Sequence, residues 1–147
     1  MPVKSKKKNK KYIIIAGCGR LGANIASLYS LRGYNAVIID NRSDAFRKLS
    51  LDYSGFSIEA DATDIDVLKK SGIATAEIVV AVTDDDNANI MISQIAKQIF
   101  DVPVVIARIY DAEKKKISEG YDIHTIDPSK LSMEALEQLL VRREQAI

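Results

Sequence analysis

Tyr12-Ile-Ile-Ile-Ala-Gly17-Cys-Gly19-Arg-Leu-Gly22 is the stretch that decides the fold of this chain. Its apolar run, Tyr12–Ala16, predicts a parallel strand that is covered on both faces. The glycine spacing predicts a tight turn that opens a helix: Gly17 permits the turn, Gly19 lets a phosphate approach the backbone, and Gly22 lets the helix pack closely on the strand. A nucleotide phosphate would then lie on free N–H groups at the positive end of the helix dipole. A glycine turn that serves packing alone is the alternative.

The composition is typical of one globular domain. A chain of 147 residues can bury one substantial core but not two, and its 47% hydrophobic and 28% charged residues favour a soluble protein. No apolar run reaches the roughly 20 residues of a membrane span. The lysine-rich N-terminus lacks the apolar segment of a secretory signal, and a single cysteine excludes an internal disulfide. We therefore expect a cytoplasmic protein.

The net charge of +1 hides an uneven distribution. Six lysines precede or adjoin the first predicted strand, and without them the chain has 15 basic and 20 acidic residues, a balance near −5. Such a body is a poor candidate for binding nucleic acid. We predict a basic flexible tail over residues 1–11 and one nucleotide-binding domain over residues 12–147. The tail could alternatively contact anionic lipid or nucleic acid.

Strand-like and helix-like segments alternate along the rest of the chain. Apolar runs predict six strands, at Tyr12–Ala16, Ala36–Ile39, Phe56–Glu59, Ile78–Val82, Val104–Ala107 and Ile123–Ile126. Helical spacing and capping residues predict helices between them and a last helix that begins at Ser129 or Ser132. The alternation predicts an α/β fold with a doubly wound parallel sheet of Rossmann type, in the order 3-2-1-4-5-6. A ligand would bind where the order reverses, above the first and fourth strands.

Asp40 lies 18 residues beyond Gly22, at the carboxyl end of the second predicted strand. A carboxylate there can accept hydrogen bonds from both ribose hydroxyls of an adenosine and would repel a 2′-phosphate. We therefore expect NAD(H), ATP or ADP as the ligand, with NADP disfavoured. Alternatively, Asp40 only caps the following turn. Arg42 could soften the preference against NADP, although a solvated arginine is the commoner arrangement, and Asn41 is included in the predicted site.

Arg20 stands inside the glycine loop, at the first turn of a helix, where a cation opposes the helix dipole. A phosphate above the loop would explain this placement, because a guanidinium can donate two hydrogen bonds to phosphate oxygens. An arginine that faces solvent or an interface is the alternative. Cys18 and Leu21 belong to the same loop and are included in the predicted site, Cys18 as a small residue that packs.

The third predicted strand is followed by Asp61, Ala62 and Thr63, which we place beside the adenine edge. A carboxylate can accept a hydrogen bond from the adenine amino group, while a backbone N–H can serve a ring nitrogen. A cluster that only caps the next helix is the alternative.

The fourth predicted strand ends at Thr83 and Asp84, at the expected crevice. Asn87 and Asn89, on the helix that follows, could line the distal half of the nucleotide. The three aspartates from Asp84 to Asp86 fall on different faces of a helix start, so no metal site is expected. No catalytic residue is assigned, since the only histidine, His124, has no evident acid–base partner.

Together these segments resemble the RCK/KTN (TrkA-N) nucleotide-binding domain of Trk and Ktr potassium-uptake regulators and of ligand-gated potassium channels. The resemblance covers Tyr12 to about Leu140 and rests on Ile15–Gly22, Val37–Asp40, Asp61–Thr63, Val80–Asp86, Ala96-Lys97, Ile106–Arg108 and Asp127-Pro128.

The resemblance implies a cytoplasmic regulatory subunit that is peripheral to the membrane through its partner. Such domains form dimers or rings beneath an integral-membrane potassium transporter or channel and respond to NAD(H), ATP or ADP. It also implies that Arg108 reaches toward the phosphates or a neighbouring subunit. Many such regulators continue into a second ligand-binding domain, so regulation through that domain stays open for this chain.

A small NAD-dependent oxidoreductase is the alternative function. A dehydrogenase needs a substrate-binding region and an acid–base group near the nicotinamide. We expect neither within this chain, so that reading would require a partner chain. A redox-sensing repressor is less consistent still, because no DNA-binding module is recognised.

Overall fold

The computed structural model describes residues 11–146. Ten of the eleven residues of the predicted basic tail lie outside this range, so its flexibility stays a prediction. Strands and helices alternate in the order β1 (Tyr12–Ala16), α1 (Arg20–Leu31), β2 (Asn35–Asp40), η1 (Ser43–Lys48), β3 (Phe56–Glu59), α2 (Ile65–Lys70), η2 (Ile73–Thr75), β4 (Ile78–Ala81), α3 (Asp86–Gln94), η3 (Ile95–Ile99), β5 (Val104–Arg108), α4 (Ala112–Glu119), β6 (His124–Ile126) and α5 (Pro128–Gln145).

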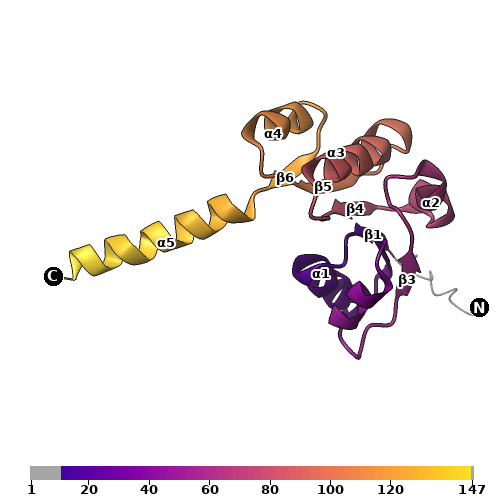
Figure 1. The fold of residues 1–147 in the computed structure, drawn as a ribbon, viewed down its shortest axis with the longest axis horizontal. Helices are drawn as coiled ribbons and strands as arrows, with labels where there is room; N and C mark the ends of the chain where they lie inside the picture. The colour runs from indigo at the N-terminus through magenta and orange to yellow at the C-terminus, as the bar shows by residue number, and fades with distance from the viewer. Residues whose placement is uncertain (1–10, 147) are drawn as a thin grey trace, which may run out of the picture.

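The six strands form one parallel sheet in the order β3-β2-β1-β4-β5-β6, which confirms the predicted Rossmann-type topology. Ile15 of β1 is paired with Ile38 of β2 on one side and with Val80 of β4 on the other. Parallel strands need helical crossovers, so the helices cover both faces of the sheet. Figure 1 shows α1 on one side of the sheet and α2 and α3 on the other.

The central strand β1 buries its side chains alternately on the two faces. Ile13 and Ile15 pack in the apolar cluster that α1 and η1 cover. Ile14 and Ala16 pack in the cluster that includes Leu68 of α2 and residues of α3. All four β1 residues are at most 1% exposed. Because both faces of β1 are buried, its sequence is a continuous apolar run without a polar alternation.

The turn after β1 depends on two close backbone approaches. Gly17 has φ +104°, a conformation that an L side chain rarely adopts, and a Cβ there would lie 2.6 Å from the carbonyl oxygen of Val82. A Cβ at Gly22 would overlap the carbonyl oxygen of Gly17. The two glycines therefore let α1 begin directly against the ends of β1 and β4, as the sequence predicted.

Two helices differ from the prediction. The last helix begins at Pro128, one residue before Ser129 and four before Ser132, because Asp127 is its N-cap and accepts hydrogen bonds from Ser129 N and Lys130 N, with Pro128 at the first helical position. The helix after β4 ends in a π-helical turn, η3, which no sequence feature indicated. In Figure 1, α5 extends away from the rest of the described chain.

Candidate functional site

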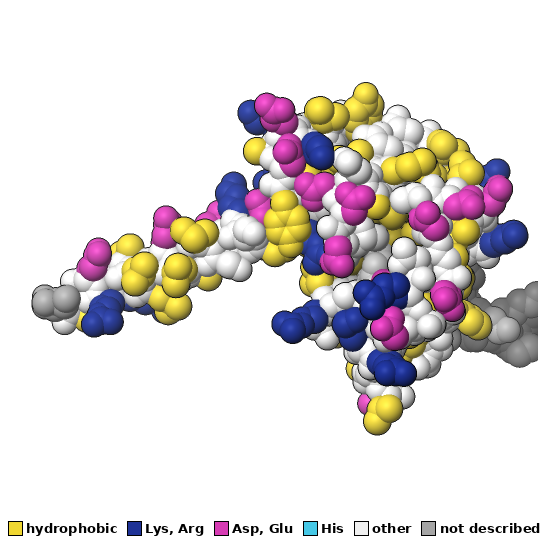
Figure 2. Space-filling view, viewed as in Figure 1, with side chains coloured by type: hydrophobic (Ala, Val, Ile, Leu, Met, Phe, Trp, Pro, Cys, Tyr) yellow, Lys and Arg dark blue, Asp and Glu magenta, His cyan; other side chains and the backbone are white. Residues whose placement is uncertain are grey.

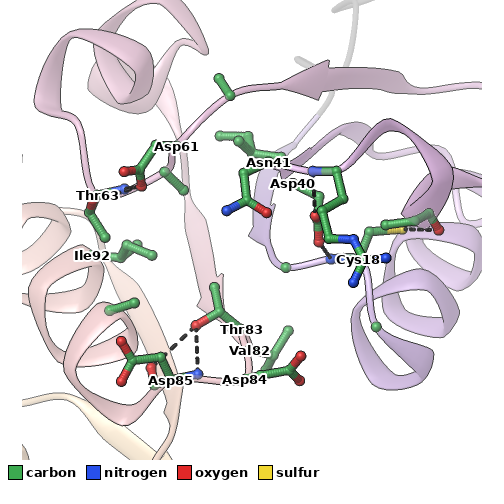
Figure 3. A pocket seen from close by; sticks show the side chains of 18 of the residues that line it. Cys18, Asp40, Asn41, Asp61, Thr63, Val82, Thr83, Asp84, Asp85 and Ile92 are labelled. Carbon is green, nitrogen blue, oxygen red and sulfur yellow. Dashed lines mark hydrogen bonds between the residues drawn. The ribbon is translucent and has the colours of Figure 1, made fainter.

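A crevice of about 510 Å³ opens at the carboxyl ends of β1, β2, β3 and β4, where the strand order reverses. Figure 3 shows polar side chains around it that follow β2, β3 and β4, among them Asp40, Asp61 and Thr83, while the end of β1 contributes the glycine loop. Most of the predicted site residues line it: Gly17, Cys18, Gly19, Asp40, Asn41, Arg42, Asp61, Ala62, Thr63, Thr83 and Asp84.

Three predicted residues do not line this crevice in the described structure. Arg20 is exposed to solvent at the first turn of α1. Leu21 packs against the apolar cluster beneath α1, and Gly22 is buried against Gly17. A role for Arg20 in phosphate binding therefore stays a prediction, while Leu21 and Gly22 shape the loop from behind.

The N-terminus of α1 faces the crevice with its donors free. Gly19 is the N-cap and supplies no side-chain cap, and the first turn of α1 contains no acidic residue. Within the described chain, a Cβ at Gly19 would meet no heavy atom within 4 Å, so this side of the loop is open. The first N–H groups of a helix have no intrahelical acceptor and lie at the positive end of its dipole. This geometry suits an anionic group such as a phosphate.

Asp40 is held in place by two backbone donors. Cys18 N donates to Asp40 Oδ2 at 2.8 Å, and Arg42 N donates to Asp40 Oδ1 at 2.9 Å. Each carboxylate oxygen has a further lone pair, so two outside hydroxyl donors can still be accommodated. The carboxylate is thus fixed beside the glycine loop without any rearrangement, as recognition of a ribose requires.

The Cys18 side chain does not offer its thiol to a ligand. Its Sγ is turned toward Ala45 of η1 and contacts the Ala45 carbonyl oxygen at 3.3 Å, and the residue is only 1% exposed. Burial raises the pKa of the Cys18 thiol, the negative charge of Asp40 raises it further, and Lys48 partly opposes both. Cys18 therefore lines the crevice with its backbone, and the thiol packs as predicted.

Asp61 and Thr63 form a local turn at the third strand end. Asp61 Oδ1 accepts hydrogen bonds from Thr63 N at 2.9 Å and from Thr63 Oγ1 at 2.7 Å. These bonds lower the pKa of Asp61. The helix α2 is capped instead by Asp64, whose side chain accepts from Asp66 N. Asp61 therefore orders the loop and leaves its other oxygen for a donor in the crevice.

The helix α3 presents apolar side chains to the crevice. Ala88 and Ile92 line it, whereas Asn87 and Asn89 do not. The expectation that these two asparagines face the nucleotide is therefore wrong. Asn87 accepts a hydrogen bond from Lys114 of α4 at 2.9 Å, and Asn89 is buried beneath the loop that follows β4.

Sequence reasoning missed a group of lining residues on η1. Asp44, Ala45 and Lys48 face the crevice from the segment that follows β2. Arg42 forms an exposed ion pair with Asp44 at 3.2 Å, which accounts for its placement without a ligand. No motif marks these positions. The sequence does predict a short helix from Ser43 to Leu49. Only if that helix were also expected to fold back beside the glycine loop could its residues have been placed at the crevice. Other lining residues that were not predicted are Ile39, Ala60, Val82 and Asp85.

Arg108 is turned toward the loop after β4 and is not among the lining residues. Its Nη2 donates to the carbonyl oxygens of Val82 at 2.9 Å and Thr83 at 3.0 Å, and lies 3.6 Å from Asp84 Oδ1. A direct reach toward phosphates in the crevice is therefore not the observed arrangement. His124 is exposed on the edge strand β6 and also lies outside the crevice.

Comparisons with known proteins relate the chain to potassium-uptake proteins. The family model of the TrkA-N domain matches residues 13–127. The Trk system potassium uptake protein TrkA of Streptomyces coelicolor is 33% identical over 115 residues, which is 78% of this chain and 52% of that protein. A TrkA homolog of Pyrococcus abyssi is 40% identical over 108 residues, 74% of this chain and 48% of that protein. The chain thus spans about half the length of these relatives.

Solved structures agree on the fold. The GsuK channel bound to NAD superposes with a TM-score of 0.77 at 21% identity, covering 94% of this chain and 24% of that one. GsuK bound to ADP gives a TM-score of 0.75 at 21% identity, covering 90% and 34%. None of the helices described here is both long enough and apolar enough to cross a membrane. The family match spans most of the chain, and the crevice lies where the glycine loop predicted it: the chain belongs to the TrkA-N domain family.

Proposed function

We propose that this chain is the nucleotide-binding regulatory part of a potassium-transport system, and that its crevice binds NAD(H), ATP or ADP. The observation that carries the proposal is the pairing of an uncapped helix N-terminus with a fixed carboxylate. The free N–H groups at the start of α1 suit phosphates, and Asp40 stands beside them with lone pairs for ribose hydroxyls.

The choice of ligand rests on the residues around Asp40. A 2′-phosphate would bring negative charge against that carboxylate, so NADP is disfavoured. Arg42 does not offset this strongly, since it is exposed and paired with Asp44. The relatives are Trk system potassium uptake proteins, which supports a potassium-uptake role, and GsuK was solved with NAD and with ADP.

The partner in this proposal is an integral-membrane potassium transporter or channel, with the chain held at its cytoplasmic face. The proposed role is regulation and not catalysis, because a shift in conformation requires only that the nucleotide bind one state better than another. A hydride-transfer enzyme would need an acid–base group beside the nicotinamide, and the described histidine lies at the far edge of the sheet.

We also propose that the chain works as a homo-oligomer, and α5 supports this. Within the described chain, none of its 18 residues is buried. Apolar side chains line it in Figure 2, and six are 48–62% exposed: Leu131, Met133, Leu136, Leu139, Leu140 and Val141. Most helical stability in proteins comes from packing an apolar face, so a helix of this kind needs a neighbour. A second copy of the chain presents the same helix and can supply that neighbour.

Calorimetric titration with ADP, NAD and NADP tests the ligand. We expect ADP and NAD to bind more tightly than NADP, and equal or tighter NADP binding would contradict the assigned role of Asp40. Arg20→Ala serves as a second test, with an expected loss of roughly 1–3 kcal/mol in binding if the exposed guanidinium closes over a phosphate.

A flux measurement tests the regulatory role. Vesicles that contain a Trk-type membrane subunit are assayed for potassium uptake with and without this protein. We expect nucleotide to change the flux only when the protein is present. Flux that ignores nucleotide in both preparations would refute the regulatory role, even if the crevice binds nucleotide.

A further inference from the structure

Asn89 is a buried amide whose hydrogen-bonding capacity is fully used. It lies on α3, is 1% exposed, and directs its side chain to the loop that follows β4. Its Oδ1 accepts from Thr83 N at 2.8 Å and from Thr83 Oγ1 at 2.7 Å. Its Nδ2 donates to Thr83 O at 3.0 Å and to Arg108 O at 2.8 Å. One side chain thus holds every polar group of Thr83.

The same loop is held from β5 by a second set of contacts. Arg108 Nη2 donates to the carbonyl oxygens of Val82 and Thr83. The carboxylate of Asp86 accepts from the backbone N–H groups of Tyr110 and Asp111, which ties the start of α3 to the end of β5. The loop from Val82 to Asp85 is therefore fixed from below by α3 and β5, while its upper side lines the crevice.

We infer that Asn89 is a positioning residue for the nucleotide crevice. It touches no ligand in this role. It fixes the backbone of Thr83, and so determines where the loop after β4 lies relative to the glycine loop. The inference rests on the proposed nucleotide binding for its effect on affinity, but the contacts that carry it exist without a ligand.

The closeness of the glycine loop explains why this loop has to be fixed. A Cβ at Gly17 would lie 2.6 Å from Val82 O and 2.7 Å from Thr83 N, so the two loops are in backbone contact. A displacement of Thr83 would therefore disturb the turn that carries the free helix N–H groups. Because Asn89 accepts two hydrogen bonds and donates two, neither an apolar nor a purely accepting side chain can replace all four.

Ser93 provides a matched control on the same helix. It lies one turn beyond Asn89, is fully buried, and donates from Oγ to Ile90 O at 2.9 Å. That bond stays within α3 and does not reach the crevice loop. Ser93→Ala therefore removes a buried polar group from the same helix without releasing Thr83.

The first experiment compares ADP affinity and thermal unfolding for the wild-type chain, Asn89→Ala and Ser93→Ala. We expect both variants to melt at a lower temperature. Asn89→Ala should weaken ADP binding about tenfold or more, the effect of losing one or two buried hydrogen bonds at a binding site. Ser93→Ala should bind within about twofold of wild type, because the bond it removes stays within α3 and does not reach the crevice loop. An Asn89→Ala affinity within about twofold of wild type, or equal losses in the two variants, would overturn the inference.

A second measurement keeps the test decisive if Asn89→Ala does not fold. Amide hydrogen exchange of the wild-type protein is followed at Thr83 with and without ADP. We expect the Thr83 amide to be protected already in the free protein, with little change on adding ADP, because Asn89 supplies its acceptor. An amide that exchanges freely until ADP is added would refute the inference. If the wild-type chain binds neither ADP nor NAD, the proposed function fails, and Thr83 exchange alone then decides whether Asn89 holds the loop.

Discussion

The glycine loop contains two positions at which substitution by alanine should affect different properties. At Gly22 it should lower stability, and at Gly19 it should weaken nucleotide binding. At Gly22, a methyl group would overlap the carbonyl oxygen of Gly17 and lie 3.3 Å from Val82 Cγ2. The neighbour is backbone, so α1 must move away from the strand ends. At Gly19, a methyl group meets no heavy atom of the described chain within 4 Å, and the backbone has φ −79° and ψ −168°, which any residue can adopt.

These contacts set the expected magnitudes. Overpacking costs about 1–3 kcal/mol, and a clash with backbone should fall at the upper end even after the gain in helix propensity. Gly22→Ala should therefore lower the melting temperature by roughly 6–12 °C. Gly19→Ala should change stability by no more than about 1 kcal/mol, because the loss of a glycine N-cap and the reduced freedom of the unfolded chain oppose each other.

In ADP affinity, we expect Gly19→Ala to be the more strongly affected variant. The methyl group of Gly19→Ala would occupy the open side of the loop and should weaken ADP binding about tenfold or more. The assays are thermal unfolding by circular dichroism and titration calorimetry on the same preparations. A Gly22→Ala protein that melts like wild type would refute the close approach. A Gly19→Ala protein that binds ADP like wild type would refute phosphate binding at this loop.

Three further predictions concern the rest of the crevice and α5. Asp40→Asn should weaken ADP binding about tenfold or more and reduce discrimination against NADP, measured by calorimetry, since the amide offers one acceptor oxygen to two backbone donors. Thr63→Val should raise the pKa of Asp61, which NMR titration would measure. In the wild type, the lowered pKa stabilises the folded state at pH values above the ordinary carboxyl pKa. This stabilisation is lost as the pH falls through the pKa of the folded state. Replacing Leu136 and Leu139 by Ser should shift light scattering toward the monomer, whereas unchanged particle mass would exclude this face from the contact.

The strand order was predictable because each strand is a short apolar run and the runs alternate with helix-period segments. The placement of the glycine loop and Asp40 at the crevice was predictable for a related reason, because both occupy fixed positions relative to those strands. In each case a local pattern determines which strand end a residue occupies, and parallel strands bring their carboxyl ends to one edge.

The remaining parts of the site depend on side-chain direction, which the sequence did not reveal. Asn89 was expected in the crevice because it follows a strand end, but the helical turn rotates it beneath Thr83. Lys48 reaches the crevice only because η1 folds back beside the glycine loop. The start of α5 was recoverable, since Asp127 before Pro128 is a capping residue before a proline at the first helical position.

The buried thiol of Cys18 can serve as a chemical probe of how often the glycine loop opens. It is the only cysteine in the chain, so an alkylating reagent has a single target. Its Sγ is shielded by η1, and burial together with the charge of Asp40 raises the pKa of the thiol, so little reactive thiolate forms at neutral pH. Modification therefore has to wait until the loop and η1 separate. The labelling rate therefore reports how often η1 separates from the glycine loop, and a ligand that binds across the crevice should slow it.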